Sequence, residues 1–303
     1  MQRFYHGLGK RGPYFEGWYV KLQAPDGQTL ALIPSVHIDA KGRRSASLQV
    51  ITSERSWWVD YPAAVFRASP KRFFVRLGQN LFTENGLSLR VKVPGLQLEG
   101  CLQYGPMHPL PSNIMGPFRF LGDMECAHGV LSMWHTLQGK VTCNGKTTDF
   151  SGGVGYIETD RGRSFPSEYF WTQCAWKDTA QMQNSLMLAV AEIPLWKLRF
   201  TGCIGAVQYQ GKVYQLATYR GAKVERWSRQ GAAIRQGKYR IEAVLLQSHG
   251  HSLRAPENGN MGRSVTESVD AMVRYRFWYG GRLLMEHTDL CAGFEYSRAG
   301  FDQ

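Results

Sequence analysis

The stretch that decides the fold is Val273-Arg274-Tyr275-Arg276-Phe277-Trp278-Tyr279-Gly280-Gly281. Its odd-numbered positions up to 279 are apolar or aromatic, whereas arginine occupies two of the positions between them. Because successive side chains of a β-strand point to opposite faces of a sheet, this period of two predicts a strand with one buried face. The double glycine that follows tolerates the positive φ angles of a tight hairpin turn. The stretch therefore predicts an antiparallel strand that enters a hairpin.

The same period recurs along the chain, and dipeptides that suit hairpin turns separate the segments that carry it. In segment 87–93, leucine and valine alternate with serine, arginine and lysine. The dipeptides are Asp26-Gly27, Asn85-Gly86, Asn144-Gly145, Gln210-Gly211 and Gly280-Gly281. A helical period is not sustained over three turns anywhere, and the best helix candidate is segment 184–193, which Pro194 would end. We therefore predict an all-β fold.

A dozen or more antiparallel strands have edges that must be protected, and closure into barrels removes those edges. We predict two antiparallel β-barrel domains packed together, with few short helices. The proline-rich segment 105–111 is the best linker, which places an N-terminal barrel at residues 1–110 and a C-terminal barrel at residues 111–303. Whether the last strands return to the first barrel stays open. Segment 252–263, which contains one proline and two glycines, is predicted to be a surface loop or a lid.

Composition and charge limit the class of protein. With 43% hydrophobic and 20% charged residues, the chain is expected to be globular. No apolar run approaches the about 20 residues of a membrane-spanning helix, and the N-terminus lacks the apolar block of a secretion signal, so we expect a cytoplasmic protein. The net charge of +12 is spread along the chain, which favours solubility or peripheral contact with anionic membrane over a nucleic-acid partner. The six cysteines include no Cys-x-x-Cys pair, which argues against structural zinc.

Four segments combine polar and aromatic residues more densely than strand periodicity requires. They are Phe15-Glu16-Gly17-Trp18-Tyr19, residues 124–135 (MECAHGVLSMWH), residues 152–166 (GGVGYIETDRGRSFP) and residues 169–173 (YFWTQ). These segments resemble the tocopherol cyclase-like family, and the likeness continues through Ala292-Gly293-Phe294-Glu295-Tyr296, so it spans nearly the whole chain. The chain begins close to the first segment without a plastid transit peptide, so we expect a bacterial member of the family.

The resemblance implies a fold and a reaction. The plant enzymes of this family close a prenylated hydroquinone into a chromanol ring without redox change. The wider superfamily, which includes carotenoid hydratases, has two lipocalin-like barrels, and the hydratases carry a similar Gly-Tyr-x-acid segment and an upstream histidine. The resemblance therefore implies lipocalin-like barrels, a hydrophobic substrate with an isoprenoid tail, and chemistry that needs no cofactor and no metal.

Ring closure of this type, like hydration, begins when an acid protonates a trisubstituted alkene to a tertiary carbocation. Glu158 and Asp160 lie two residues apart, hence on one face if a strand continues through both. Like charges held close raise one pKa, and burial adds to the rise, so one of the two is the expected proton donor. Arg161 or Arg163 would hold the other ionised. His128 is the expected acceptor of the phenol proton.

Aromatic ring faces would stabilise the cation, at about 2 kcal/mol each when desolvated. Tyr156, in register with the acids, is expected in the catalytic group and, with Trp171 and Trp18, in the cation cradle. The substrate-binding residues that we expect are Trp18, Glu16, Trp171, Arg163 and Phe165.

These assignments have structural alternatives. The acids and arginines of segment 158–163 are equally typical of a solvated turn with local ion pairs. Glu16 suits a buried partner of an arginine at the closed end of a barrel, and His128 suits a core histidine that is fully hydrogen-bonded.

The leading hypothesis is a cofactor-independent, acid-initiated cyclase, or a related alkene hydratase, that acts on a prenylated hydroquinone in an apolar cavity. The rival is a non-catalytic lipocalin-like carrier of isoprenoid or other lipid ligands. A nucleic-acid-binding barrel is the third reading. The first two differ in whether the carboxyl groups of residues 158 and 160 project into the cavity.

Overall fold

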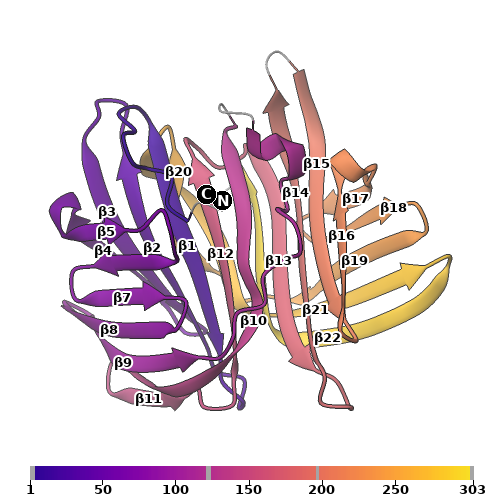
Figure 1. Cartoon of the computed structure of the whole chain (residues 1–303), viewed down its shortest axis with the longest axis horizontal. Coiled ribbons are helices and arrows are strands. Elements are labelled where there is room, and N and C mark those ends of the chain that lie inside the picture. Colours follow the sequence, from indigo (N-terminus) through magenta and orange to yellow (C-terminus); the bar gives the residue numbers. More distant parts are fainter. Residues whose placement is uncertain (1–3, 121–123, 196–197, 301–303) are drawn as a thin grey trace.

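The computed structural model describes residues 4–120, 124–195 and 198–300. Within them the elements are β-strands apart from three short 3-10 turns, which are η1 (Ala63–Val65), η2 (Gly116–Phe120) and η3 (Thr218–Arg220). The strands form two antiparallel sheets that stand side by side, the first at the left of Figure 1 and the second at the right. The prediction of an all-β fold with two antiparallel sheets is confirmed. No helix in the described residues is long and apolar enough to cross a membrane.

The first sheet has twelve strands in the order β4-β3-β2-β1-β12-β10-β9-β8-β7-β6-β5, with β11 paired to β10. Their bounds are β1 (Tyr14–Gln23), β2 (Thr29–Ile38), β3 (Arg44–Thr52), β4 (Ser56–Pro62), β5 (Phe66–Ala68), β6 (Phe74–Leu77), β7 (Asn80–Thr83), β8 (Gly86–Val93), β9 (Leu96–Tyr104), β10 (Cys126–Cys143), β11 (Lys146–Asp149) and β12 (Val154–Gly162).

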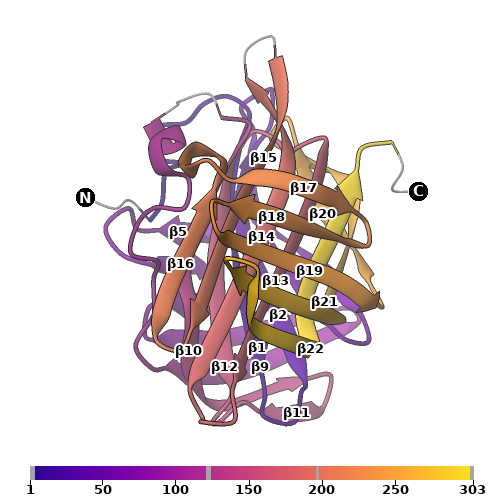
Figure 2. The same ribbon diagram turned by 90° about the vertical axis from the view of Figure 1, so that its right-hand side faces the viewer.

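The second sheet has ten strands in the order β16-β15-β14-β13-β22-β21-β19-β18-β17, with β20 paired to β21. Figure 2 turns this sheet toward the viewer. The bounds are β13 (Glu168–Lys177), β14 (Gln183–Leu195), β15 (Leu198–Tyr209), β16 (Lys212–Ala217), β17 (Lys223–Ser228), β18 (Gly231–Gln236), β19 (Tyr239–Gln247), β20 (His251–Glu257), β21 (Asn260–Tyr279) and β22 (Arg282–Arg298).

The sheets are open, which corrects the prediction of closed barrels. In the described chain no backbone pairing joins β4 to β5 or β16 to β17, the strands at the ends of the two orders. The edges are protected in another way. Edge strand β5 is only three residues long, and edge strand β17 carries a lysine, a glutamate and an arginine. Short and charged edges resist pairing with another chain, so closure is not needed.

The division between the sheets differs from the predicted domain boundary at residues 110 and 111. The proline-rich segment does lie outside the strands, but β9 and β10 on either side of it pair in the same sheet. The first sheet continues to Gly162 because β12 pairs with β1 along its whole length. The last strands, β21 and β22, pair with strands of the second sheet. Pairing between strands far apart in sequence leaves no local signal in composition.

Two local predictions are wrong. Segment 184–193 is a strand, β14, and not a helix; it lies inside the second sheet, where burial on both faces gives a continuous apolar run that resembles a buried helix. Segment 252–263 is not a loop: it forms β20 and the start of β21, with a tight turn at Asn258-Gly259. Pro256 is tolerated because β20 pairs on one side only.

Four of the five predicted hairpin dipeptides lie between two consecutive strands, whereas Gly86 of Asn85-Gly86 is already the first residue of β8. Asn144 and Gly145 have φ angles of 48° and 83°, as a type I′ turn requires. Buried apolar side chains gather in one core for each sheet and in a third group drawn from both sheets. Tyr19 of β1, Tyr156 of β12 and Trp171 of β13 belong to this third group, so the junction of the sheets is itself a core.

The glycines of two predicted turns give a test of the fold. Gly86→Ala should unfold the protein at clearly lower denaturant than Gly145→Ala, because a Cβ at residue 86 would lie 2.1 Å from the Leu102 carbonyl oxygen, whereas one at residue 145 meets nothing within 4 Å. Gly145→Ala should cost only the about 1–2 kcal/mol of a left-handed backbone. Urea unfolding of both variants measures the difference, and equal losses would contradict the pairing of β8 with β9.

Candidate active site between the two sheets

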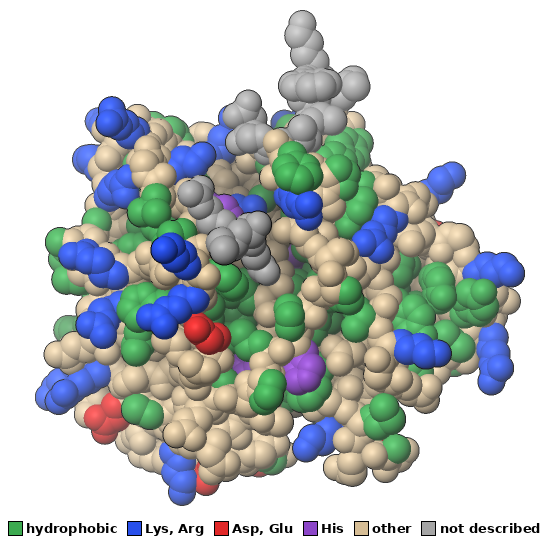
Figure 3. Space-filling view, viewed as in Figure 1, with side chains coloured by type: hydrophobic (Ala, Val, Ile, Leu, Met, Phe, Trp, Pro, Cys, Tyr) green, Lys and Arg blue, Asp and Glu red, His purple; other side chains and the backbone are tan. Residues whose placement is uncertain are grey.

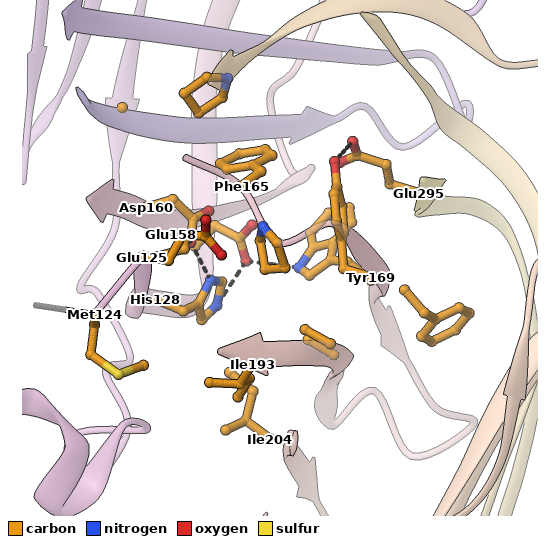
Figure 4. Close-up of a pocket in the computed structure, with 18 of the residues that line it drawn as sticks. Met124, Glu125, His128, Glu158, Asp160, Phe165, Tyr169, Ile193, Ile204 and Glu295 are labelled. Carbon is orange, nitrogen blue, oxygen red and sulfur yellow. Dashed lines mark hydrogen bonds and ion pairs between the residues drawn. The ribbon is translucent and has the colours of Figure 1, made fainter. Parts of the chain in front are cut away.

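Strand β12 carries the acids that the sequence analysis selected. It runs without a break from Val154 to Gly162, so Tyr156, Glu158 and Asp160 share one face. Glu158 and Asp160 both line a cavity between the two sheets, as Figure 4 shows. The carboxyl groups therefore face the cavity, and the solvated-turn alternative is excluded.

Apolar and aromatic side chains from both sheets make up most of the cavity wall. The first sheet contributes Phe15, Tyr19 and Ile33, and the second sheet contributes Tyr169, Trp171 and Ile204. Phe165, in the connection between the sheets, packs edge-on against Phe15 and Tyr169 at centroid distances of 5.4 and 5.5 Å.

On the face of the molecule seen in Figure 3, lysine and arginine side chains are scattered and acidic ones are few.

Glu158 is buried, with 4% of its surface exposed, and is held by two neutral donors. The Tyr156 hydroxyl donates to its Oε2 at 2.5 Å, and the Trp171 indole N–H donates to the same oxygen at 3.1 Å. Burial raises the pKa of Glu158 toward neutrality, and the nearby Asp160 adds to the rise, against the lowering effect of His128 and the two donors. Glu158 thus keeps its proton at a higher pH than an ordinary glutamate does.

His128 of β10 links the two acids of β12. Its Nδ1 lies 3.0 Å from Asp160 Oδ1, and its Nε2 lies 3.4 Å from Glu158 Oε2. Burial alone would lower the pKa of His128, but Asp160 and Glu158 outweigh it and raise this pKa to about 9. His128 therefore holds its proton at a higher pH than an ordinary histidine does, which makes it a weaker candidate for the expected proton acceptor. The thiol of Cys126 also lies 3.7 Å from Asp160 Oδ1.

His128, Glu158 and Asp160 are also the residues that could hold a cation, since one ligand atom of each lies within 4.8 Å of the others. However, Tyr156 and Trp171 both direct hydrogens at Glu158 Oε2, the oxygen that faces His128. A hydrogen-bond donor aimed at a carboxylate oxygen occupies a lone pair that a metal would need. A cation at this site would therefore have to bind Glu158 through its other oxygen, Oε1.

Three residues expected to bind substrate do not line the cavity. Trp18, 1% exposed, points to the other face of β1 and packs in the core of the first sheet. Glu16 is fully buried on that same face and accepts hydrogen bonds from the Tyr14 hydroxyl and the His6 backbone N–H. Its Oε1 also lies 2.9 Å from His6 Nδ1, so Glu16 is a structural carboxylate whose partner among the described residues is a histidine and not the expected arginine. Arg163 is exposed. Trp171 and Phe165 do line the cavity.

The structure adds acids that the sequence analysis missed: Glu125 and Glu192 line the cavity and are half-buried, and two further glutamates are buried. Glu267 of β21 and Glu295 of β22 line the cavity and are buried. Extending the period of two backward from Val273 would have placed Glu267 on the buried face. Glu295 lies in the Ala292–Tyr296 segment, which the family likeness includes. Neither signal shows that β21 contacts β2 of the first sheet and that β22 contacts β1.

Comparisons with known proteins agree with this architecture. Residues 98–296 match the model of a family described as tocopherol cyclase-like. The chain belongs to the tocopherol cyclase-like family. The match includes the Met124–His135, Gly152–Pro166 and Tyr169–Gln173 segments and omits Phe15–Tyr19.

Solved structures share the fold of this tocopherol cyclase-like chain at low identity. Kievitone hydratase from Nectria haematococca has a TM-score of 0.52 at 9% identity, over 97% of this chain and 94% of that one. CghA in complex with Sch210972 has a TM-score of 0.58 at 11% identity, over 95% of this chain and 89% of that one. No curated protein sequence matches the chain.

The charged state of His128 predicts how stability depends on pH. Because its folded pKa is raised above the unfolded value of about 6.5, the stabilisation is fully present below pH 6.5 and is lost as pH rises through about 9. We expect the free energy of unfolding to fall by up to about 3 kcal/mol from this group across that window. Urea unfolding at both ends of the window should show a smaller fall in His128→Asn, and an equal fall would contradict the assignment.

Proposed function

We propose that this protein is an acid-initiated cyclase that closes a prenylated hydroquinone to a chromanol in the cavity between the two sheets. The observation that carries the proposal is Glu158, a buried carboxyl with a raised pKa that faces an apolar cavity. Membership of a family described as tocopherol cyclase-like supports the reaction class. A carrier of apolar ligands would gain nothing from burying such a group, since burial of a carboxyl is costly.

Glu158 is the better donor of the two acids predicted from the sequence. Its carboxyl is buried and its pKa is raised, whereas the Asp160 side chain keeps 24% of its surface exposed and pairs with the charged His128. Asp160 is thus the partner that keeps His128 protonated. His128 therefore takes the place of Arg161 or Arg163, the residues that the sequence analysis expected to keep Asp160 ionised.

A single carboxyl group can both supply the proton that starts the reaction and take up the proton that ends it. The O–H bond of the Glu158 acid breaks as its proton forms a C–H bond with the less substituted alkene carbon, which leaves a tertiary carbocation and a carboxylate. The ring hydroxyl oxygen then forms a C–O bond with the cation and loses its proton to the Glu158 carboxylate. The product is an isomer of the substrate, nothing is oxidised, and the acid is regenerated. His128, already protonated, is a fixed positive charge that stabilises the carboxylate formed in the first step.

Ring faces in the cavity would stabilise the carbocation. Trp171, Tyr19 and Tyr169 line the cavity that Glu158 faces, and each ring face is worth about 2 kcal/mol against a desolvated cation. Tyr156 contacts Glu158 instead, so its role is to orient the acid. Trp18 has no part in the cradle because it lies in the first-sheet core.

Hydration of an alkene is the second candidate reaction. It begins with the same protonation, but water in place of the ring hydroxyl attacks the cation. The structural neighbour named kievitone hydratase supports this alternative. Membership of the tocopherol cyclase-like family favours ring closure as the first candidate.

The source of the substrate follows from its chemistry. A ligand with an isoprenoid tail resides in membranes, and we propose that the net positive chain docks peripherally on anionic lipid from the cytoplasmic side.

Glu158→Gln should lower kcat for ring closure at least about 100-fold, because the amide cannot donate a proton to an alkene, while substrate affinity changes little. Combining it with Asp160→Asn should remove turnover and keep ligand binding. The product has the same mass as the substrate, so chromatographic retention and the ultraviolet spectrum measure conversion.

In the wild type, kcat should fall as pH rises through the raised pKa of Glu158. Unchanged turnover in Glu158→Gln would contradict the donor assignment.

Glu16→Gln is the matched control, since Glu16 is an equally buried glutamate that does not line the cavity. It should lower stability while kcat per folded molecule stays the same.

Removal of metal ions tests the cation alternative at His128, Glu158 and Asp160. Prolonged dialysis against a chelator should leave kcat unchanged, because the proposed steps use only protons and ring faces. Loss of activity that a single divalent metal restores would contradict the mechanism.

A further inference from the structure

Strand β10, which carries His128, contains two β-bulges where it pairs with β12. Val130 of β10 lies opposite Glu158, whereas His135 lies opposite Gly155. Five steps along β10 therefore match three steps along β12, so β10 holds two extra residues in this stretch, one for each bulge. The pairing of β12 with β1 on its other side is regular, so the irregularity belongs to β10. We refer to residues 130–135 as the double bulge.

The double bulge determines which residue of β10 meets the acids. His128 lies opposite Asp160, but the register at His135, continued without the extra residues, would place His128 opposite Gly162. That position is two residues, or about 7 Å, further along β12. A single extra residue would turn the imidazole to the other face of the sheet. Only both bulges together place His128 between Glu158 and Asp160, as seen in Figure 4.

Ser132 lies inside the double bulge and is fully buried. Its hydroxyl donates to the Trp134 carbonyl oxygen at 2.7 Å and accepts from the His108 backbone N–H at 3.1 Å. His135 Nδ1 lies 3.2 Å from the same hydroxyl oxygen. A serine hydroxyl offers one donor and two acceptor sites, so these contacts use its full capacity.

The proline-rich segment 105–111, predicted from the sequence as a linker, contacts the same bulged residues through His108. The His108 carbonyl oxygen accepts from the Met133 N–H at 2.8 Å, and His108 Nδ1 lies 3.2 Å from the Trp134 carbonyl oxygen. The His108 ring stacks on the Trp134 ring at a centroid distance of 3.7 Å. A bulge interrupts the hydrogen bonds between its strands, so a segment that supplies partners to its backbone stabilises it in one form.

Gly155 of β12 leaves room for the bulged strand. A Cβ at this position would lie 2.3 Å from Nε2 of His135. The Gly-Tyr-x-acid segment therefore contains both the acid, Glu158, and the glycine that admits the double bulge.

We infer that Ser132 and His108 are positioning residues of the candidate active site. They hold the double bulge, and the double bulge places His128 between the two acids of β12. Neither is among the described residues that line the cavity, so both act through His128 and not on a ligand. The expected effect on turnover rests on the proposed function, whereas the placement of His128 does not.

The test measures the pKa of His128 by NMR in protein labelled with ¹³C-histidine, with the resonance assigned by its loss in His128→Asn. The wild type should titrate at about 9. In Ser132→Ala the pKa should fall toward the ordinary value of about 6.5, a loss of at least about 10-fold in proton affinity, because the imidazole no longer lies between two acids. His108→Ala changes a half-buried residue and keeps the serine, so it should lower the pKa less. It decides the question if Ser132→Ala does not fold.

Turnover gives a second measurement. His128 lowers the pKa of Glu158, so displacement of His128 should raise that pKa and move the fall of kcat in Ser132→Ala to higher pH. The maximal kcat should drop at least about 10-fold, because the carboxylate formed in the first step loses a fixed positive charge. A merely structural loss would reduce the amount of folded enzyme without moving the pH profile.

Ser268→Ala is the matched control. Ser268 is 1% exposed, lies beside a bulge of β21 and donates to a side chain two residues on, Asp270 Oδ1, at 3.1 Å. This variant should lose stability while the pKa of His128 and the pH profile keep their wild-type values.

A wild-type pKa of His128 in both His108→Ala and folded Ser132→Ala would overturn the inference, and so would an equal fall in Ser268→Ala. If the pKa falls as expected but the wild type converts no prenylated hydroquinone, the positioning role stands and the proposed reaction fails.

Discussion

Three glutamate carboxyls, Glu158, Glu267 and Glu295, lie out of water where the two sheets meet, and the cost of burying negative charge there governs the chemistry of the cavity. His128 is charged, but it is shared between Asp160 and Glu158. Burial is the largest cause of the raised pKa of each of the three glutamates. Carboxyls that keep their protons near neutrality are the acids that alkene protonation requires.

The junction of two open sheets creates this environment. The first sheet supplies Glu158, His128 and Tyr156 from β10 and β12. The second sheet supplies Trp171 of β13, which donates to Glu158, and Glu267 and Glu295 from β21 and β22. The acids of the cavity wall thus come from strands of both sheets. Aromatic side chains of the same wall, among them Trp171 and Tyr19, offer ring faces beside these acids.

The sequence predicts local features well and long-range pairing poorly. The period of two in segment 273–279 and the Asn144-Gly145 turn follow from backbone geometry, and both appear in the structure. The face shared by Glu158 and Asp160 follows from the same rule. Trp18 was misassigned because a motif does not reveal that Trp18 and Tyr19, adjacent residues of β1, face different cores. Glu267 was missed because its meeting with Glu295 depends on pairing between β21 and β22 across a bulged register.

The protonation state of Glu158 tests the central claim most directly. Infrared difference spectroscopy between the wild type and Glu158→Gln, recorded about one pH unit below neutrality, isolates the carbonyl stretch of this one carboxyl, while Glu267 and Glu295 cancel. The account predicts a protonated-acid band in the wild type that disappears in the variant and that is replaced by carboxylate bands as pH rises. A wild type that shows only the carboxylate bands of Glu158 at that pH would contradict it.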